Sequence, residues 1–343
     1  MRGPHWHVLG VLSLGVWLTA CAPAPAGTPT SPAAPAASAA GAGTPTAAVP
    51  VRVGFANVTA VHAPLWTALE GGAFARQGLA VELVNLGPSQ ATQAALLAGE
   101  APVASVSGSS TLNVLLAGGD LVIIGAVFDT MPYQLVANRD IATLAELQGK
   151  TIGVNRFGGA ADFVLRYLLR QQGIDPDTQV SILQVGAQRE RLAALRGGGL
   201  HATLVDPPFQ TIAEREGLRI LVDTAELNIP YPQDVVVVSR EWLRTSRDLA
   251  RRVLAGILEG GRQFHEDREL GERALRRWLQ LDDARLVRET YDYFQRYIPA
   301  EPLPRPEGLQ LVIDEVGTTH PEAHSMRPQD LVDPSLIAEL ARP

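Results

Sequence analysis

The chain has 343 residues, of which 46% are hydrophobic and 19% are charged, as is ordinary for a globular protein. This length fits one large domain or two medium-sized domains. The net charge of -7, without any basic stripe, argues against nucleic acid as a partner. A single cysteine, Cys21, excludes a disulfide within the chain.

The first 21 residues read as a targeting segment and not as part of the fold. Arg2 precedes an apolar run from Val8 to Leu18, which is shorter than the about 20 residues of a membrane-spanning helix. Leu18-Thr19-Ala20-Cys21 resembles the lipobox of bacterial lipoproteins, in which the cysteine carries lipid. We therefore predict a lipoprotein signal peptide with lipidation at Cys21. The alternative is an ordinary signal peptide with a chance cysteine.

Residues 22–50 consist almost entirely of Ala, Pro, Thr, Gly and Ser. Such a segment buries too little apolar surface to offset its conformational entropy, so we predict a disordered tether that its prolines keep extended. An anchor followed by a tether and a globular region predicts an extracytoplasmic, membrane-anchored lipoprotein, at the cell surface or in the periplasm. Lipid at Cys21 would hold it there.

After the tether, strands and helices alternate. The elements predicted for the first unit, in chain order, are a strand at 51–56, a helix with Pro64 in its first turn that ends at Gly78, a strand at 81–86, a helix from Ser89, as its cap, to Ala98, a strand at 103–106, and a helix opened by Ser107–Ser110. Short apolar strands separated by helices indicate a parallel sheet.

The chain repeats this scheme. Thr151–Val154 matches the first strand, 180–185 matches the second, and the segment from Ala193 to Pro207 has the helix end, glycine stop, apolar strand and polar turn of 94–110. Two units of the order strand, helix, strand, helix, strand are stronger evidence of architecture than any single motif. We predict two α/β lobes.

Two passages connect the predicted lobes. The strand 121–127 is followed by a polar turn from Phe128 to Tyr133, a strand at 134–137 that leaves the first lobe, and a short helix at 141–147. A proline-rich passage at 229–232 precedes the strand 235–239. Two crossing strands between lobes are the usual parts of a hinge.

From Trp242 the pattern is helical, and we expect these helices to pack back on the first lobe. The predicted organisation is lobe I at 51–133, lobe II at 134–230, and a return to lobe I at 231–343.

Several stretches together resemble one family. They are 95–101 before a strand, 140–154 (DIATLAELQGKTIGV), 237–243 (VVSREWL) and 289–294 (ETYDYF). In order and spacing they are similar to the solute-binding proteins of ABC importers for nitrate, sulfonates and taurine, and to relatives that bind thiamine-precursor pyrimidines. The resemblance implies a type II periplasmic-binding-protein-like fold whose lobes close on a small molecule.

The family's cleft, carried over, falls on the polar turns after the strands, where open α/β sheets bind ligands. The candidate ligand-binding residues are Asn57, Thr59, His62, Ser89, Gln90, Ser107, Gly108, Ser109, Phe128 and Asp129 in the first lobe, Arg156, Gly158, Gly159, Gln188 and Asp206 in the second, and Tyr231 in the return passage. We expect the N–H groups of Gly108 and Ser109 to donate to the ligand, and His62 or Phe128 to cover a ligand face. The alternative for Ser107–Ser110 is that they only cap a helix.

Asp206 is the most informative candidate. A carboxylate in the cleft repels a bare anion and attracts an amine or an N–H edge, which favours an aminosulfonate or a neutral heterocycle over nitrate. The alternative is that Asp206 only caps a helix. Arg156 could pair an anion, or it could be a solvated charge in a turn.

The function predicted is that of an extracytoplasmic solute-binding protein of an ABC importer, not an enzyme, with no cofactor and no metal. Its expected partners are a small molecule and a membrane permease, and we expect a monomer. One alternative is an enzyme on the same fold, such as a pyrimidine synthase with lysine-bound pyridoxal phosphate. Lys150, the only lysine, starts a strand, which argues against that version. A second alternative is a ligand sensor for a membrane receptor.

Overall fold

The computed structural model describes residues 47–299 and 302–342. The described residues belong to one compact unit, 46–343. The predicted signal peptide, Cys21 and most of the predicted tether lie outside the described residues. The tether was expected to reach Pro50, whereas the first strand already begins at Val49. Among the described residues, no helix is long and apolar enough to cross a membrane.

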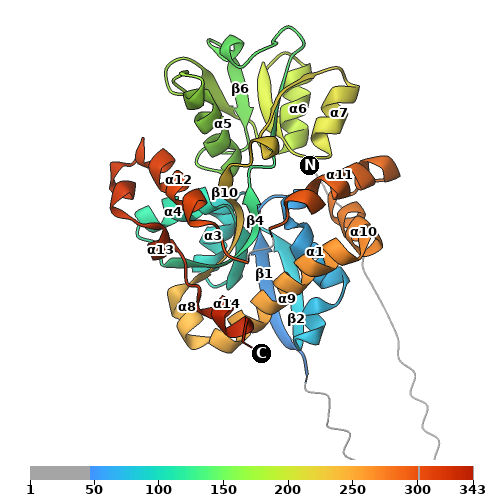
Figure 1. Cartoon of the computed structure of the whole chain (residues 1–343), viewed down its shortest axis with the longest axis vertical. Helices are drawn as coiled ribbons and strands as arrows, with labels where there is room; N and C mark the ends of the chain where they lie inside the picture. The colour runs from blue at the N-terminus through green and yellow to red at the C-terminus, as the bar shows by residue number, and fades with distance from the viewer. Residues whose placement is uncertain (1–46, 300–301, 343) are drawn as a thin grey trace, which may run out of the picture. The chain divides into compact units, whose positions relative to one another are not determined.

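Two five-stranded sheets organise this unit (Figure 1). The first has the order β2-β1-β3-β10-β4 and the second has the order β7-β6-β8-β5-β9. The bounds of the first sheet's strands are β1 Val49–Phe55, β2 Leu79–Asn85, β3 Val103–Val106, β4 Leu121–Thr130 and β10 Pro230–Ser239; those of the second are β5 Gln134–Ala137, β6 Thr151–Val154, β7 Ser181–Gln184, β8 Ala202–Val205 and β9 Arg219–Asp223. We call the first sheet and its helices lobe I, and the second sheet and its helices lobe II.

The two sheets have the same plan, as the internal repeat predicts. In each, three strands joined by helices run parallel, and a fourth, antiparallel strand is inserted beside the third. In lobe I the inserted strand is β10, which arrives after the chain has passed through lobe II. The structure is therefore a two-lobed α/β fold of the type II periplasmic-binding-protein-like class.

Helices cover both sheets. In lobe I they are α1 Ala63–Glu70, α2 Ala73–Arg76, α3 Ser89–Leu97 and α4 Gly108–Leu116, and in lobe II α5 Ala160–Gln171, α6 Gln188–Arg196 and α7 Phe209–Arg215. The helix predicted to run to Gly78 is broken at Gly72, whose φ of 71° is left-handed, so it forms α1 and α2. Pro64 does lie in the first turn of α1.

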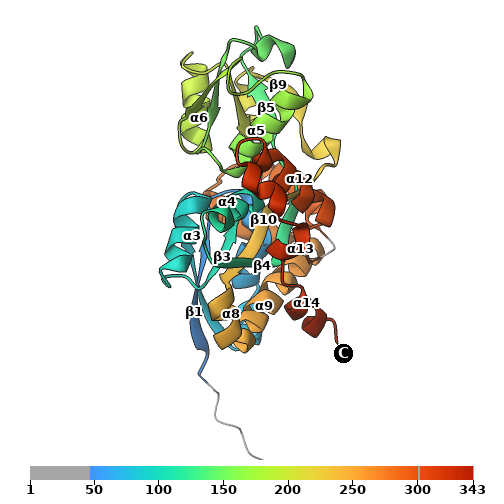
Figure 2. The ribbon, with the colours of Figure 1, turned by 90° about the vertical axis from the view of Figure 1, so that its left-hand side faces the viewer.

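The C-terminal helices are α8 Arg240–Thr245, α9 Arg247–Glu266, α10 Arg268–Leu279, α11 Ala284–Tyr297, α12 Pro306–Gly317, α13 Pro328–Leu331 and α14 Ser335–Leu340. Helix α9 packs on α1 so closely that a Cβ on Gly260 would lie 2.2 Å from the Pro64 carbonyl oxygen. Helix α12 packs against β10 and α4 (Figure 2). Lobe I thus carries the tail, and its core contains Phe55 and Trp66, against which the partly buried Trp278 packs.

Three local predictions are corrected. Strand β4 continues through Thr130 with all ten residues buried, so Phe128–Thr130 are not a turn. The segment 141–147 forms only a single turn of 3-10 helix at Ala145–Leu147, and the Glu146 carboxylate accepts a hydrogen bond from the Ala142 N–H at 2.6 Å. Ser89 is the first residue of α3 and not its cap; its hydroxyl accepts the Ser107 N–H at 3.3 Å.

The chain crosses between the lobes twice, at 131–133 and at 224–229. The crossings are bonded to each other, because the Thr224 N–H donates to the Tyr133 carbonyl at 2.8 Å and the Tyr133 N–H donates to the Thr224 hydroxyl at 3.0 Å. This pairing brings the strand-end turns of both lobes to the same side of the hinge.

Candidate functional site

A cavity of about 570 Å³ lies between the lobes and is lined by the turns at the strand ends. We call it the outer cavity. Its walls are formed by Asn57, Val58, Thr59, Asn85, Gly87 and Pro88 of lobe I, by Tyr133 at the crossing, by Asn155, Ala161, Gly186, Ala187, Gln188, Arg189, Glu190, Arg191, Asp206, Pro208 and Phe209 of lobe II, and by Trp278, Leu279, Gln280 and Leu281 from the end of α10. This volume suits a small organic molecule.

A second cavity of about 40 Å³ lies beside it, and we call it the inner chamber. The two cavities share Asn57, Thr59, Tyr133 and Asn155. The other residues lining the inner chamber are Ala56, Val61, His62, Ser89, Gln90, Val106, Ser107, Gly159, Ala160, Gln233 and Asp234. It has room for a small polar group of a molecule whose body lies in the outer cavity.

The carboxyl group of Asp206 at the outer cavity has a hydrogen-bond partner on only one of its two oxygens among the described residues. Asp206 follows β8 directly and is 1% exposed. Its Oδ1 accepts a hydrogen bond from Gln188 Nε2 at 2.9 Å, while its Oδ2 is buried and has no partner among the described residues. Burial raises the pKa of Asp206 to about 7, although the Gln188 bond and nearby Arg191 act in the opposite direction. A donor from a bound molecule would complete this group.

His62 and Asp234 form a buried ion pair in the wall of the inner chamber. His62 Nδ1 lies 2.8 Å from Asp234 Oδ2, and His62 Nε2 contacts the Ala56 carbonyl oxygen. Because both neighbours are acceptors, both ring nitrogens donate and the ring is an imidazolium. Burial alone would lower the pKa of His62, but the Asp234 carboxylate raises it overall. The Ser105 hydroxyl also donates to Asp234 Oδ2, at 2.7 Å.

This cluster does not have the geometry of a catalytic triad. Ser105 and Asp234 both contact the same ring nitrogen of His62, and the other nitrogen is bound to a backbone carbonyl. In a triad the two partners lie on opposite nitrogens. The cluster therefore forms part of the chamber wall, and its geometry does not activate Ser105 as a nucleophile. The described residues also contain no group of three or more acidic, histidine or cysteine side chains that could hold a metal ion.

Arg191 is buried beneath the outer cavity, and its guanidinium is bound by neutral acceptors. Its Nε donates to the Thr203 hydroxyl at 3.0 Å, and its terminal nitrogens donate to the carbonyls of Gly186 and Leu204. Burial lowers the pKa of Arg191 to about 10, which still leaves it charged at neutral pH. Since Gly186 and Leu204 flank the cavity turns, Arg191 fixes the backbone that carries Asp206.

The outer cavity has an aromatic wall. Trp278 stacks on the buried Trp66 with ring centroids 5.5 Å apart and planes 5° apart. Phe209 faces it from lobe II, and the exposed guanidinium of Arg189 lies 5.4 Å from the Phe209 ring. The outer cavity therefore offers apolar area on two sides and one cation at its rim.

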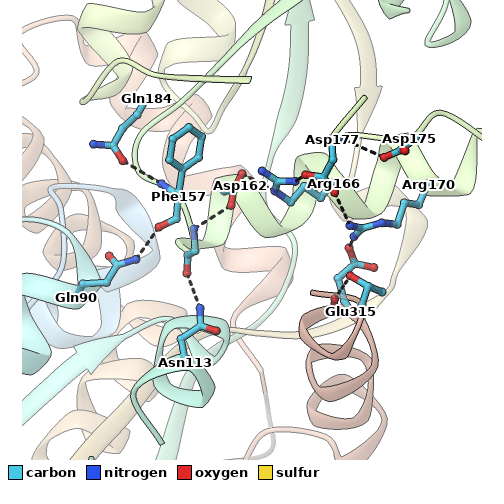
Figure 3. Close-up of polar contacts among 12 residues, drawn as sticks. Gln90, Asn113, Phe157, Asp162, Arg166, Arg170, Asp175, Asp177, Gln184 and Glu315 are labelled. Carbon is cyan, nitrogen blue, oxygen red and sulfur yellow. Dashed lines mark hydrogen bonds and ion pairs between the residues drawn. The ribbon is translucent and has the colours of Figure 1, made fainter. Parts of the chain in front are cut away.

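Polar contacts also join the lobes directly (Figure 3). Gln90 Nε2 donates to the Phe157 carbonyl at 2.9 Å, and Asn113 Nδ2 donates to the Gly158 carbonyl at 3.4 Å. Arg170 of α5 pairs with Glu315 of α12. We call the α5–α12 contact and the charges around it the seam.

The seam is a chain of charges of alternating sign (Figure 3). Asp162 contacts Arg166 at 2.9 Å, Arg166 contacts Asp177 at 2.6 Å, and Asp177 and Glu315 both lie near Arg170. A shallow cavity of about 220 Å³ opens beside it. Every charged side chain named here has an opposite partner.

The structure brings most of the predicted site residues to the two cavities. Those that line the outer cavity, the inner chamber or both are Asn57, Thr59, His62, Ser89, Gln90, Ser107, Gly159, Gln188 and Asp206. Their roles toward a ligand remain predictions.

Phe128 and Asp129 lie elsewhere, which corrects the prediction for both. Phe128 is fully buried in the core of lobe I, edge-on to Phe294 at 5.5 Å. The Asp129 carboxylate is held by Arg305 Nε at 2.7 Å. Both belong to the long β4, whose end pairs with Pro230 of β10.

Gly108, Ser109 and Tyr231 pack behind the chamber and do not line it. The Ser109 and Tyr231 hydroxyls lie 3.0 Å apart, and the Tyr231 ring stacks on Phe163. A Cβ on Gly108 would lie 2.5 Å from the Pro232 side chain, so glycine there permits a close approach. The Ser107 hydroxyl accepts the Ser110 N–H at 3.3 Å. The helix-cap interpretation of this turn therefore holds, and donation by Gly108 and Ser109 to a ligand in the cavities is not supported.

Arg156 and Gly158 also lie outside both cavities. Arg156 is exposed, as the interpretation of a solvated turn charge expects. Gly158 lines the seam cavity, and its φ of 72° is left-handed.

Sequence reasoning missed several lining residues. Gln233 and Asp234 precede the strand that was predicted to start at 235, because Pro230 and Pro232 suggested a break. In the structure β10 begins at Pro230, and a bulge next to Asp234 turns it toward the chamber. Asn155 directly follows β6, which is a signal that could have found it, whereas Tyr133 lies between β4 and β5 and Arg191 is the fourth residue of α6. Trp278 looked like a core residue, and nothing local distinguished it.

Known proteins match this chain over a large part of its length. The family model described as NMT1/THI5 like matches residues 59–269, which is more than half of the chain. The chain belongs to the NMT1/THI5-like family. Among curated relatives, "Putative binding protein YtlA" of Bacillus subtilis (strain 168) is 24% identical over 213 residues, which are 60% of this chain and 64% of that protein. The match thus spans less than two thirds of that relative's length.

Solved structures agree with this NMT1/THI5-like assignment at the level of fold. The alkanesulfonate-binding protein SsuA from Xanthomonas axonopodis pv. citri, bound to MOPS, has a TM-score of 0.66 and 17% identity, with 83% of this chain and 95% of that chain covered. The periplasmic aliphatic sulphonate binding protein SsuA from Escherichia coli has a TM-score of 0.64 and 20% identity, with 80% and 87% covered.

Proposed function

We propose that this protein is an extracytoplasmic solute-binding protein of an ABC importer, which captures a small organic molecule between its lobes and delivers it to a membrane permease. The single observation that carries the proposal is Asp206, a buried carboxylate with one unpartnered oxygen among the described residues, in a cavity of ligand size between two hinged lobes. Family membership supports the transport role. The proposal includes the predicted lipid anchor at Cys21 and a monomeric state.

The ligand we propose is aminosulfonate-like or pyrimidine-like. An amino group or the N–H edge of a pyrimidine would donate to Asp206, and a flat or short apolar body would lie against Trp278 and Phe209. An acidic group of an aminosulfonate would face Arg189 at the rim. Closure follows if the molecule binds the closed lobes more tightly than the open ones.

Binding is tested by thermal unfolding and by tryptophan fluorescence of the purified protein with taurine, alkanesulfonates, MOPS and aminopyrimidines. A ligand at 100 times its Kd stabilises the folded state by about 2.7 kcal/mol. Because Trp278 lines the cavity, a ligand there also changes the fluorescence, and a Trp278→Phe variant loses most of that change. If no compound of the panel stabilises the protein, or if one is chemically converted, the transport proposal is wrong.

A further inference from the structure

Five buried oxygen atoms at the two cavities have no hydrogen-bond partner among the described residues. All are acceptors that belong to side chains lining the inner chamber, the outer cavity or both, namely Gln90 Oε1, Asn155 Oδ1, Asp206 Oδ2, Gln233 Oε1 and Asp234 Oδ1. A buried acceptor without a donor is costly, and native proteins rarely collect several in one place.

Three side-chain amide donors of the same region are already engaged. Gln188 Nε2 bonds to Asp206, Gln233 Nε2 bonds to the Tyr133 hydroxyl at 2.9 Å, and Gln90 Nε2 bonds to the Phe157 carbonyl. The two buried cations are engaged as well, since both ring nitrogens of His62 contact protein oxygens and three guanidinium nitrogens of Arg191 do. Trp278 Nε1, in the wall of the outer cavity, is also buried without a partner among the described residues. Two of the five unpartnered oxygens, Asp206 Oδ2 and Asp234 Oδ1, belong to carboxyl groups, which offer no N–H to a ligand.

We infer that the floor formed by Gln90, Asn155, Asp206, Gln233 and Asp234 is a subsite for a donor-only N–H group, and that it rejects an anionic head. Either an ammonium or amidinium cation, or the amino edge of a neutral heterocycle, supplies such donors. This inference rests on the proposed function, whose cavity it uses.

The rejection of anions follows from the same atoms. A sulfonate or nitrate at the floor would place its oxygens against the carboxyl groups of Asp206 and Asp234, and the glutamine amide donors nearby are already bound within the protein. Arg189, the exposed cation, lies at the rim and not at the floor. A bound molecule therefore directs its N–H groups toward the floor and any acidic group toward the rim.

The test compares ligands that each have one six-membered aromatic ring and that differ in the polar group they carry. Benzamidine, 4-aminopyridine, 4-aminopyrimidine and benzenesulfonate are titrated into the purified full chain by isothermal calorimetry. We expect benzamidine or an amino-heterocycle to bind at least about tenfold more tightly than benzenesulfonate, the ratio that one charge-assisted hydrogen bond supplies. The neutral compound, 4-aminopyrimidine, separates the heterocycle edge from the cations.

Asp206→Asn sharpens the test, because it replaces an acceptor oxygen by an N–H donor of the same shape. We expect it to weaken benzamidine by about tenfold or more and to strengthen benzenesulfonate. Asp129→Asn is the matched control, since that carboxylate is equally buried but is held by Arg305 outside the cavities. Circular dichroism establishes that each variant is folded.

The inference is overturned if benzenesulfonate binds as tightly as the N–H compounds, if none of the N–H compounds binds, or if Asp206→Asn leaves the order of affinities unchanged. These outcomes are distinct from failure of the proposed function. Sulfonates that bind and change the Trp278 fluorescence would preserve a solute-binding cavity while refuting the acceptor floor.

Discussion

The outer cavity and the seam both lie between the same two lobes, and both contain buried or half-buried charges. In the seam, Arg170 has Glu315 and Asp177 nearby, and Asp162 has Arg166. In the cavities, Asp206 and Asp234 each keep one buried oxygen without a partner among the described residues. The charges of the seam are thus paired within the protein, whereas the carboxyl groups of the cavity floor require a donor from outside. The difference separates a contact that supports the structure from one that supports binding.

The largest effect is expected at the His62–Asp234 pair. His62→Ala would leave the Asp234 carboxylate buried without its cation, and breaking a buried pair in this way costs about 3–5 kcal/mol of unfolding free energy. Urea denaturation measures it. The control is His320→Ala at the seam cavity, where the histidine is half exposed beside Glu322, and where we expect almost no change. A His62→Ala protein as stable as the control would show that the pair is not ionised.

Opposite signs are expected for carboxylates of the two regions. The pKa of Asp206 is about 7 in the folded protein, against an ordinary value of 3.8 for an aspartate side chain. Its stabilising contribution is therefore complete below about pH 4 and is lost as the pH rises through about 7, by up to about 4 kcal/mol. Asp206→Asn should stabilise the unliganded protein at pH 8, whereas Glu315→Gln at the seam should destabilise it.

Thermal melts from pH 4 to pH 9 measure this contrast. The difference in unfolding free energy between wild type and Asp206→Asn should grow from pH 4 to about pH 7 and then level off. A constant difference would mean that Asp206 is ionised throughout this pH range. An Asp206→Asn protein that is less stable than wild type at pH 8 would contradict the claim that the ionised Asp206 carboxylate is buried without a partner.

How far the sequence predicts these regions depends on how local each signal is. The alternation of strands and helices and the two α/β lobes follow from a repeat of about one hundred residues, and Asp206 is found because it directly follows an apolar strand. Gln233 and Asp234 are not found in this way, because two prolines interrupt the pattern. Only the pairing with β4 shows that β10 begins at Pro230. Phe128 was misplaced for the complementary reason, since the same pairing extends β4 past the expected turn.

Local sequence patterns do not predict contacts between segments that are far apart in the chain. Trp278 reaches the outer cavity from α10, and Glu315 reaches Arg170 from α12. The spacing of apolar and charged residues in these segments predicts helices. It does not predict which other element each helix contacts. The unpartnered oxygens of the floor cannot be predicted from the sequence, because only the hydrogen bonds of the folded chain show which groups already have partners.

A smaller effect is expected when the seam is weakened. Glu315→Gln removes the charge that faces Arg170 across the lobes and should cost about 1 kcal/mol of closure, so ligand affinity falls by roughly fivefold. Glu216→Gln is the matched control, because Glu216 pairs with Arg196 at 2.6 Å within lobe II and away from the seam. Calorimetry gives the affinity, and small-angle X-ray scattering gives the lobe separation. Equal losses in both variants would mean that the seam does not report on closure.

The smallest effect is expected at Arg156. Its side chain is exposed beside the Phe157–Gly158 contacts but lines neither cavity, so Arg156→Ala should change ligand binding by less than about 0.5 kcal/mol. Arg189→Ala is the informative companion, because Arg189 lies over Phe209 at the rim. If the ligand carries an acidic group that points outward, Arg189→Ala weakens it and increasing salt has the same effect on wild type, while Arg156→Ala does neither. A loss at Arg156 that matches the loss at Arg189 would instead place the acidic group over the β6 turn and would restore Arg156 as the partner of an anion.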